Sequence, residues 1–280
     1  MPIGRLVVWS ASQGVVRLVN LNGSEVSNTI VSQVHSDLGV FPRFDATRGH
    51  VTLHTGDVIY GGPPRTVVVV DTTGALRRDI GPASGFTKIV AVRQLADDTV
   101  LVVGRRAEDA SSTVNGLWLV DANDAVTLLA DLPGMVLGYG GADISHDGTR
   151  VAYLALGPSF TSELRVLDVS NGAITVLEPN ARSPRWSSQG DRVAYLVPSG
   201  GYSDLDGFAV VTNANGTGRR DLGSAVFSVG LAWSPDGKYL LGRSGYGSFL
   251  LMRVSDDASV LLRFRSPNGG YVDYNQPDWR

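Results

Sequence analysis

Apolar residues in this chain occur in short runs of strand length that are separated by polar and glycine-containing turns. Residues 66–71 and 165–169 form two such runs. Apolar residues do not recur over three turns at the spacing of three and four residues that marks an amphipathic helix. The pattern therefore predicts many short β-strands and little helix.

The composition favours the same fold class. The 280 residues include 37 Val and 34 Gly, but only 4 Glu and 2 Lys. β-Branched residues fit a pleated sheet, glycine accepts the positive φ of tight turns, and a chain poor in Glu and Lys is poorly supplied for surface helices. We expect an all-β fold.

One motif recurs six times along the chain. Segments 141–154, 183–196 and 230–243 align without a gap, and three weaker copies share their register. Successive copies are 42 to 50 residues apart, the length of a four-stranded propeller blade. We therefore predict a single domain over residues 1–280, a six-bladed β-propeller of antiparallel blades. Each copy places one residue, its anchor, in a common column: Phe44, Gln94, Ile144, Trp186, Trp233 and Trp279.

A second feature of each copy is a dipeptide typical of hairpin turns, placed between two strand-like runs. Such dipeptides accept the left-handed backbone angles of tight turns between antiparallel strands. They indicate that every blade contains hairpins. The six are Asn22-Gly23, Thr73-Gly74, Asn123-Asp124, Asn171-Gly172, Asn215-Gly216 and Asp256-Asp257.

The ends of the chain complete one blade. Trp186 and Trp233 each lie seven positions before the first apolar residue of the next strand. Counting from Trp279 past Arg280 and on from Met1, seven positions reach Leu6. We predict that residues 275–280 supply the innermost strand of the N-terminal blade and so close the ring without a free sheet edge.

These repeats resemble the TolB-like, WD40-like propeller repeat, in which an aromatic residue precedes Ser-Pro-Asp-Gly and an apolar strand. Residues 233–238 match the motif fully, and residues 144–148 and 186–190 match it in part. The resemblance implies the propeller fold and says little about function, because propellers host many unrelated activities. We expect Asp147 and Asp236 to shape turns and the anchor tryptophans to fill space between blades.

The residues just before the anchors are candidates for a site at the axis of the ring, and we call them the axis column. Five of the six are charged, and equivalent positions of a ring converge near its axis. A structural Arg–Asp network between blades is one interpretation, and a site for a small anionic ligand in the channel is the other. The column consists of Arg43, Arg93, Asp143, Arg185, Ala232 and Asp278.

Loops at one mouth of the ring are a second candidate surface. Residues 54–65, 105–115, 157–162 and 198–207 are insertions expected between second and third strands. Aromatic residues at loop tips either pack onto the blades or form a recognition rim. The tyrosines that we select as binding candidates are Tyr139, Tyr202, Tyr246 and Tyr271.

The net charge and the remaining motifs narrow the range of possible functions. The net charge of −3 and the lack of a basic cluster argue against nucleic acid, and no apolar run is long enough for membrane insertion. The chain contains no Cys, and His50 and His54, on one strand, are too far apart to share a metal. We expect no cofactor, no metal and no catalytic residue, with an oxygen-ligated calcium ion in the channel as the alternative that stays open; His146 is expected in a turn.

Two functions remain. One is a non-catalytic binding module that presents a propeller face or channel mouth to a protein or peptide partner. The alternative is a small-molecule hydrolase or lyase, similar to a lactonase, with its pocket in the central channel. The resemblance to TolB-like propellers, which often act as binding modules outside the cytoplasm, implies the first function and an extracytoplasmic location, periplasmic or secreted. The first residues of the chain lack a signal peptide, so an export signal or tether would lie outside this sequence.

Overall fold

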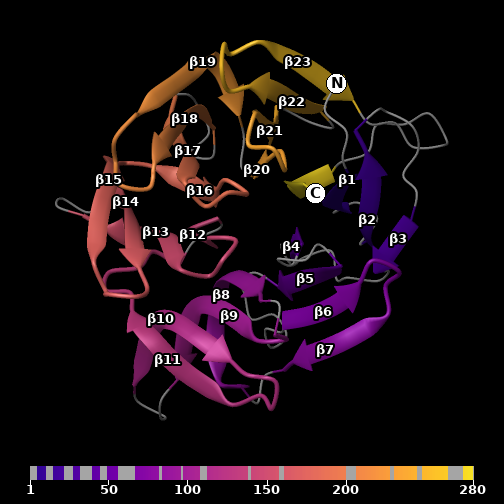
Figure 1. Ribbon diagram of the computed structural model, residues 1–280, viewed down its shortest axis with the longest axis vertical. Helices are drawn as coiled ribbons and strands as arrows, with labels where there is room; N and C mark the ends of the chain where they lie inside the picture. Colours follow the sequence, from indigo (N-terminus) through magenta and orange to yellow (C-terminus); the bar gives the residue numbers. More distant parts are fainter. Residues whose placement is uncertain are drawn as a thin grey trace.

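The computed structural model confirms the six-bladed propeller. Its strands form six four-stranded antiparallel sheets arranged as a ring around a central axis (Figure 1). The structure describes residues 5–10, 15–21, 28–31, 40–44, 49–55, 67–81, 84–95, 97–107, 112–137, 140–157, 161–199, 206–227, 230–244, 248–263 and 274–279.

Each sheet runs from an innermost strand at the channel to an outermost strand at the rim. The first blade contains β24 (Tyr274–Trp279), β1 (Arg5–Ser10), β2 (Val15–Asn20) and β3 (Asn28–Val31). The second contains β4 (Val40–Phe44), β5 (His50–Thr55), β6 (Val67–Asp71) and β7 (Leu76–Ile80). The third contains β8 (Phe86–Gln94), β9 (Val100–Ala107), β10 (Thr113–Val120) and β11 (Val126–Asp131).

The other three blades repeat this order. The fourth contains β12 (Ala142–Ile144), β13 (Arg150–Leu156), β14 (Ser162–Asp168) and β15 (Ile174–Pro179). The fifth contains β16 (Arg182–Trp186), β17 (Arg192–Pro198), β18 (Gly207–Asn213) and β19 (Arg220–Phe227). The sixth contains β20 (Leu231–Trp233), β21 (Tyr239–Arg243), β22 (Ser248–Arg253) and β23 (Ser259–Arg263).

The predicted closure of the ring is confirmed. β24 pairs antiparallel with β1, and Trp279 lies opposite Leu6 while Asp278 lies opposite Val7. The indole of Trp279 packs in one apolar cluster with Leu6 of its own blade and Phe249 of the sixth blade. The C-terminal strand therefore joins the first blade and also seals it against the last one.

The anchors keep the predicted register in all blades but one. Phe44, Ile144, Trp186 and Trp233 lie opposite the apolar residue seven positions later, as Trp279 does across the chain ends. Gln94 instead lies opposite Val100, six positions later. The turn of the third blade is one residue shorter, and Asp98 takes a positive φ of 63° there.

The hydrophobic core is divided into six wedges. Each buried apolar cluster joins side chains of two neighbouring blades. Tyr153 and Tyr195, both fully buried, sit on second strands and fill two of these wedges. Because no blade has a core of its own, blades stabilise one another only within the assembled ring.

The connections alternate between the two ends of the channel, because successive strands of a blade are antiparallel. The described turns after first and third strands are tight and lie at one end, which we call the tight-turn end. The second strands end, and the third strands begin, at the other end. Of the predicted hairpin dipeptides, five fall between third and fourth strands with a positive φ at their second residue, and Asn22-Gly23 lies outside the described residues.

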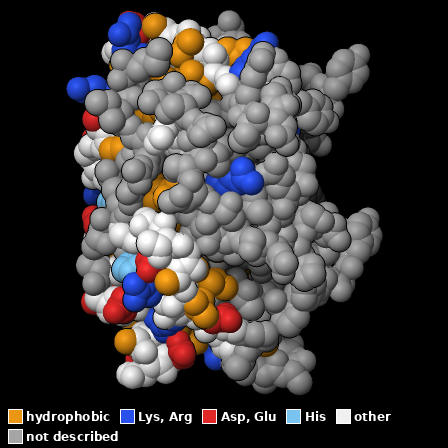
Figure 2. Space-filling model, turned by 90° about the vertical axis from the view of Figure 1, so that its right-hand side faces the viewer, with side chains coloured by type: hydrophobic (Ala, Val, Ile, Leu, Met, Phe, Trp, Pro, Cys, Tyr) orange, Lys and Arg blue, Asp and Glu red, His pale blue; other side chains and the backbone are white. Residues whose placement is uncertain are grey.

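The rim of the ring mixes charged and apolar side chains. Arg78 pairs with Asp124 at 2.6 Å, and Arg219 pairs with Asp221 at 2.7 Å. The outer strands also leave some apolar side chains exposed, such as Leu76 and Val176. Figure 2 shows described side chains of both charge signs interspersed with apolar ones on one side of the ring. Among the described residues, no helix has the length and apolarity needed to cross a membrane.

Candidate functional site

The axis column occupies one equivalent position in every blade. Each of its residues is the penultimate residue of an innermost strand, so the six converge on the channel. Arg43, Arg93, Asp143 and Arg185 are 4 to 7% exposed. Charged side chains that are buried to this degree require hydrogen-bond or ion-pair partners.

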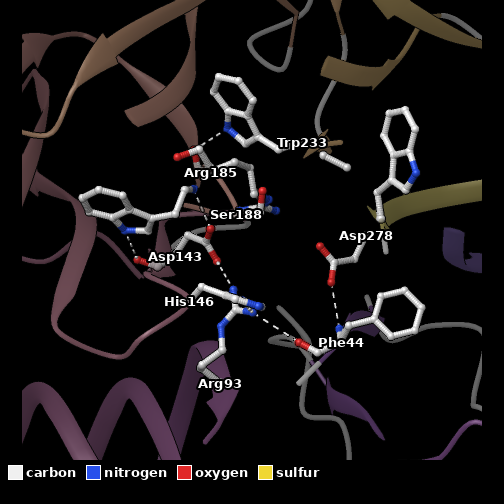
Figure 3. A pocket seen from close by; sticks show the side chains of 12 residues that line it. Phe44, Arg93, Asp143, His146, Arg185, Ser188, Trp233 and Asp278 are labelled. Carbon is white, nitrogen blue, oxygen red and sulfur yellow. Dashed lines mark hydrogen bonds and ion pairs between the residues drawn. The ribbon is translucent and has the colours of Figure 1, made fainter. Parts of the chain in front are cut away.

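The two carboxylates of the column connect neighbouring blades. Asp143 accepts a hydrogen bond through Oδ2 from the backbone N–H of Trp186 at 2.9 Å. Asp278 accepts one in the same way from the backbone N–H of Phe44 at 2.7 Å (Figure 3). In both cases the donor is the anchor of the following blade.

The arginines of the column donate mainly to backbone carbonyl groups. Arg93 donates to Phe44 in the second blade at 3.2 Å and to Ile144 in the fourth blade at 3.1 Å. Arg185 donates to Leu231 of the sixth blade at 3.2 Å and to Pro184 at 2.8 Å. The predicted contact between blades is present, but most of its hydrogen bonds run between a side chain and the backbone.

The Arg–Asp contacts themselves are long. Oδ1 of Asp143 lies 3.9 Å from both Nε of Arg43 and Nη2 of Arg93. At this distance the attraction is Coulombic and no hydrogen bond forms. Asp143 therefore lies between two guanidinium groups without forming the bidentate pair that arginine favours.

The column carries an excess of positive charge, with three arginines against two aspartates. The pKa of Arg185 is lowered to about 9, first by burial and next by the charge of Arg43, with Arg93 adding to the effect. Asp143 and Asp278 oppose this shift but do not cancel it. The site is electropositive at neutral pH.

A small pocket opens beside the column, and we call it the axial pocket. The space that the centre of a water molecule can occupy there is about 40 Å³, room for about three waters. His146 and Ser188, in the turns after β12 and β16, are partly exposed, so the pocket opens at the tight-turn end. It is lined by Phe44, Arg93, Asp143, His146, Arg185, Trp186, Ser187, Ser188, Ala232, Trp233, Asp278 and Trp279.

Sequence analysis located only part of this pocket. Four charged residues of the axis column line it, whereas Arg43 lies against Asp143 and does not. His146 is in a turn as expected, but its Nδ1 also lies 3.2 Å from Nη1 of Arg93. The missed lining residues lie up to two positions after an anchor, and that spacing is the signal that would have found them. The candidate tyrosines Tyr139, Tyr202, Tyr246 and Tyr271 lie outside the described residues.

The tryptophan and turn residues have the structural positions that the repeat predicts. The indole N–H groups of Trp186 and Trp233 donate to the carbonyls of Asp143 and Arg185, in the preceding blade, at 3.2 and 3.0 Å. Asp147 accepts from the backbone N–H of Thr149 at 3.0 Å and so holds its turn. Within the described part of the chain, no three His, Cys, Asp or Glu side chains are grouped so that they could hold a metal ion.

Comparison with solved structures shows the same architecture in other proteins. TolB from Acinetobacter baumannii matches with a TM-score of 0.70 and 14% identity over 99% of this chain and 66% of its own, so this chain spans just under two thirds of that protein. A protein from Agrobacterium tumefaciens assigned to TolB matches with a TM-score of 0.57 and 10% identity, over 98% and 99% of the two chains. An oligogalacturonate lyase in complex with manganese matches with a TM-score of 0.55 and 16% identity, over 94% and 73%.

Neither protein-family models nor the curated proteins yield a match to this chain. At 10 to 16% identity the structural likeness establishes the fold and leaves the activity open. The resemblance inferred from the Ser-Pro-Asp-Gly repeat is confirmed at that level: the chain has the six-bladed propeller fold of the TolB structures.

Proposed function

We propose that this protein is a non-catalytic binding module that receives a protein or peptide partner at the channel mouth of the tight-turn end. The observation that carries the proposal is the use of both axial carboxylates as acceptors of backbone N–H groups from the next blade. These carboxylates contribute to the shape of the ring, and neither is placed as a free general base.

The other titratable groups of the pocket support the same function. Among the described residues, His146 is the only histidine that lines it, and its Nδ1 faces a guanidinium group that can only donate. A hydrolase or lyase in the channel needs a base that faces its substrate and room for that substrate. A volume of about 40 Å³ suits the tip of a side chain better than a sugar or a lactone.

The sequence repeat also supports a binding function. Its resemblance to TolB-like propellers, which often serve as binding modules outside the cytoplasm, favours a protein partner and an extracytoplasmic location for this chain. The mixed charges of the described rim argue against a nucleic-acid partner.

The test is a peptide-display selection on the full chain, followed by binding measurements with two variants. Ser188→Trp places an indole at the partly exposed mouth of the axial pocket. Thr127→Trp adds the same side chain at an exposed position of β11, far from the channel in the ring. We expect selected peptides to lose at least about tenfold in affinity for the first variant and to keep it for the second.

Two results would overturn the proposal. Equal binding of the selected peptides to both variants would place the binding surface away from the channel mouth. Turnover of a lactone or of a uronic-acid oligomer that disappears in Ser188→Trp would make the channel a catalytic pocket. Circular dichroism and thermal midpoints of both variants serve as controls for folding.

A further inference from the structure

Two buried nitrogen donors of the axial pocket have no hydrogen-bond partner. They are Nε of Arg93 and Nε1 of Trp279, in side chains that are more than nine-tenths buried and line the pocket. The equivalent indole nitrogens of Trp186 and Trp233 do donate to carbonyl groups of the preceding blade. Because a buried donor without an acceptor is costly, these two donors indicate an acceptor that a ligand would supply.

The charge of the site indicates the sign of that ligand. Three guanidinium groups against two carboxylates leave one positive charge in excess at the axis. The oxygens Oδ2 of Asp143 and Asp278 already accept backbone hydrogen bonds, and Oδ1 of Asp143 lies between Arg43 and Arg93. A monoanion would neutralise the excess charge, whereas a dianion such as phosphate would reverse it.

The size of the pocket limits the ligand further. About 40 Å³ of space for water centres corresponds to about three waters, which matches the three heavy atoms of a carboxylate group. A planar carboxylate presents two oxygens with about four acceptor positions, enough for an indole N–H and guanidinium N–H groups together.

We propose that the axial pocket binds a carboxylate group, which accepts a hydrogen bond from Nε1 of Trp279 and compensates the charge of Arg93 and Arg185. The carboxylate belongs either to a small free anion or to an acidic side chain of a bound peptide. The site does not depend on the proposed partner binding, since a free carboxylate satisfies the same donors.

The experiment replaces sodium chloride by sodium acetate at constant ionic strength and follows the thermal midpoint of the full chain. At about pH 8 Arg185 keeps its charge. Acetate should raise the midpoint, since a ligand that binds only the folded state stabilises it. Acetamide, which has the same shape without the charge, should not.

Matched variants assign the effect to the pocket. Trp279→Phe removes the unpartnered donor and should weaken acetate binding at least about tenfold. Trp118→Phe removes a buried indole donor on β10 that a carbonyl already engages and that does not line the pocket, so it should lower the midpoint and keep the acetate response. Arg185→Gln should abolish the response. Line broadening of ¹³C-labelled acetate on the unmodified chain measures binding without any variant.

Three results would refute the site: acetate and chloride acting alike on the unmodified chain, acetamide acting like acetate, or both tryptophan variants losing the response equally. A capped Gly-Glu-Gly peptide and its Gln counterpart distinguish the two sources. If the Glu peptide binds more tightly than acetate, an acidic side chain of a partner is the natural ligand. If acetate binds and the peptide does not, the ligand is a small free anion and the carboxylate site stands, while the peptide-display selection alone decides the proposed peptide mouth.

Discussion

Aspartates buried at the channel and aspartates in exposed turns use their carboxylates differently. Asp143 is buried and accepts a backbone hydrogen bond from Trp186, 43 positions away in the sequence and in another blade. Asp236 lies in an exposed turn and accepts from Lys238, two positions away. The axial carboxylates therefore fix how blades meet, whereas the turn carboxylates fix the shape of single hairpins.

The largest effect should come from removing the strand that closes the ring. Deleting residues 275–280 removes the hydrogen-bonded partner of β1 and the buried indole of Trp279. We expect the thermal midpoint to fall by at least about 10 °C in calorimetry. Adding the hexapeptide of residues 275–280 should restore part of the loss. An unchanged midpoint would show that the closing strand does not hold the ring together.

The next effect compares an axial carboxylate with a turn carboxylate directly. Asp143→Ala leaves the N–H of Trp186 without its acceptor and removes the negative charge between Arg43 and Arg93. We expect it to lower the free energy of unfolding by about 3 kcal/mol or more. The matched change Asp236→Ala, in an exposed turn, should cost about 1 kcal/mol. Urea unfolding measures both, and similar losses would contradict the division between axial and turn carboxylates.

A smaller effect tests the charge at the axis by pH. Arg185 shares its site with Arg43, Arg93, Asp143, Asp278 and His146. Its lowered pKa of about 9 means that it loses its charge as the pH rises through that value. The stabilisation by acetate should therefore be full near pH 8 and decline by about pH 10, above the range in which histidine titrates. An acetate response that is constant over this range would exclude Arg185 as the responsible charge.

The smallest effect concerns the turns. The side-chain hydroxyl of Thr99 and then its backbone N–H lower the pKa of Asp97 below its usual 3.8. The resulting stabilisation is present above that value and is lost as the pH falls through the folded-state pKa. Asp97→Asn keeps the acceptor oxygen without titrating, so its midpoint should decline less steeply between about pH 4 and pH 2. Identical slopes for the variant and the unmodified chain would remove Asp97 from the acid response.

The sequence predicted the ring well because its information is local and repeated. The anchor tryptophans, the hairpin dipeptides and the distance from Trp279 round to Leu6 each constrain one strand or one turn, and together they require six blades. Gln94 breaks the rule because the turn of the third blade is one residue shorter; a non-aromatic anchor is not the cause, since Ile144 keeps the register.

For the axial site, the sequence predicted which residues converge but not the hydrogen bonds that they form. The axis column converges as expected, but the choice of hydrogen-bond partners depends on how far one innermost strand is shifted relative to the next. No spacing in the sequence encodes that offset. The same limitation explains why His146 and Trp279 were not recognised as pocket residues.

The shared first blade has a topological consequence. Because Leu6 lies opposite Trp279 in an antiparallel pair, the start of β1 and the end of β24 are neighbours. A short peptide linker between them would make the backbone circular, and a cut in any long connection would then give a permuted chain with the same six sheets. The seam between the termini is one of several equivalent places at which this circle can be opened.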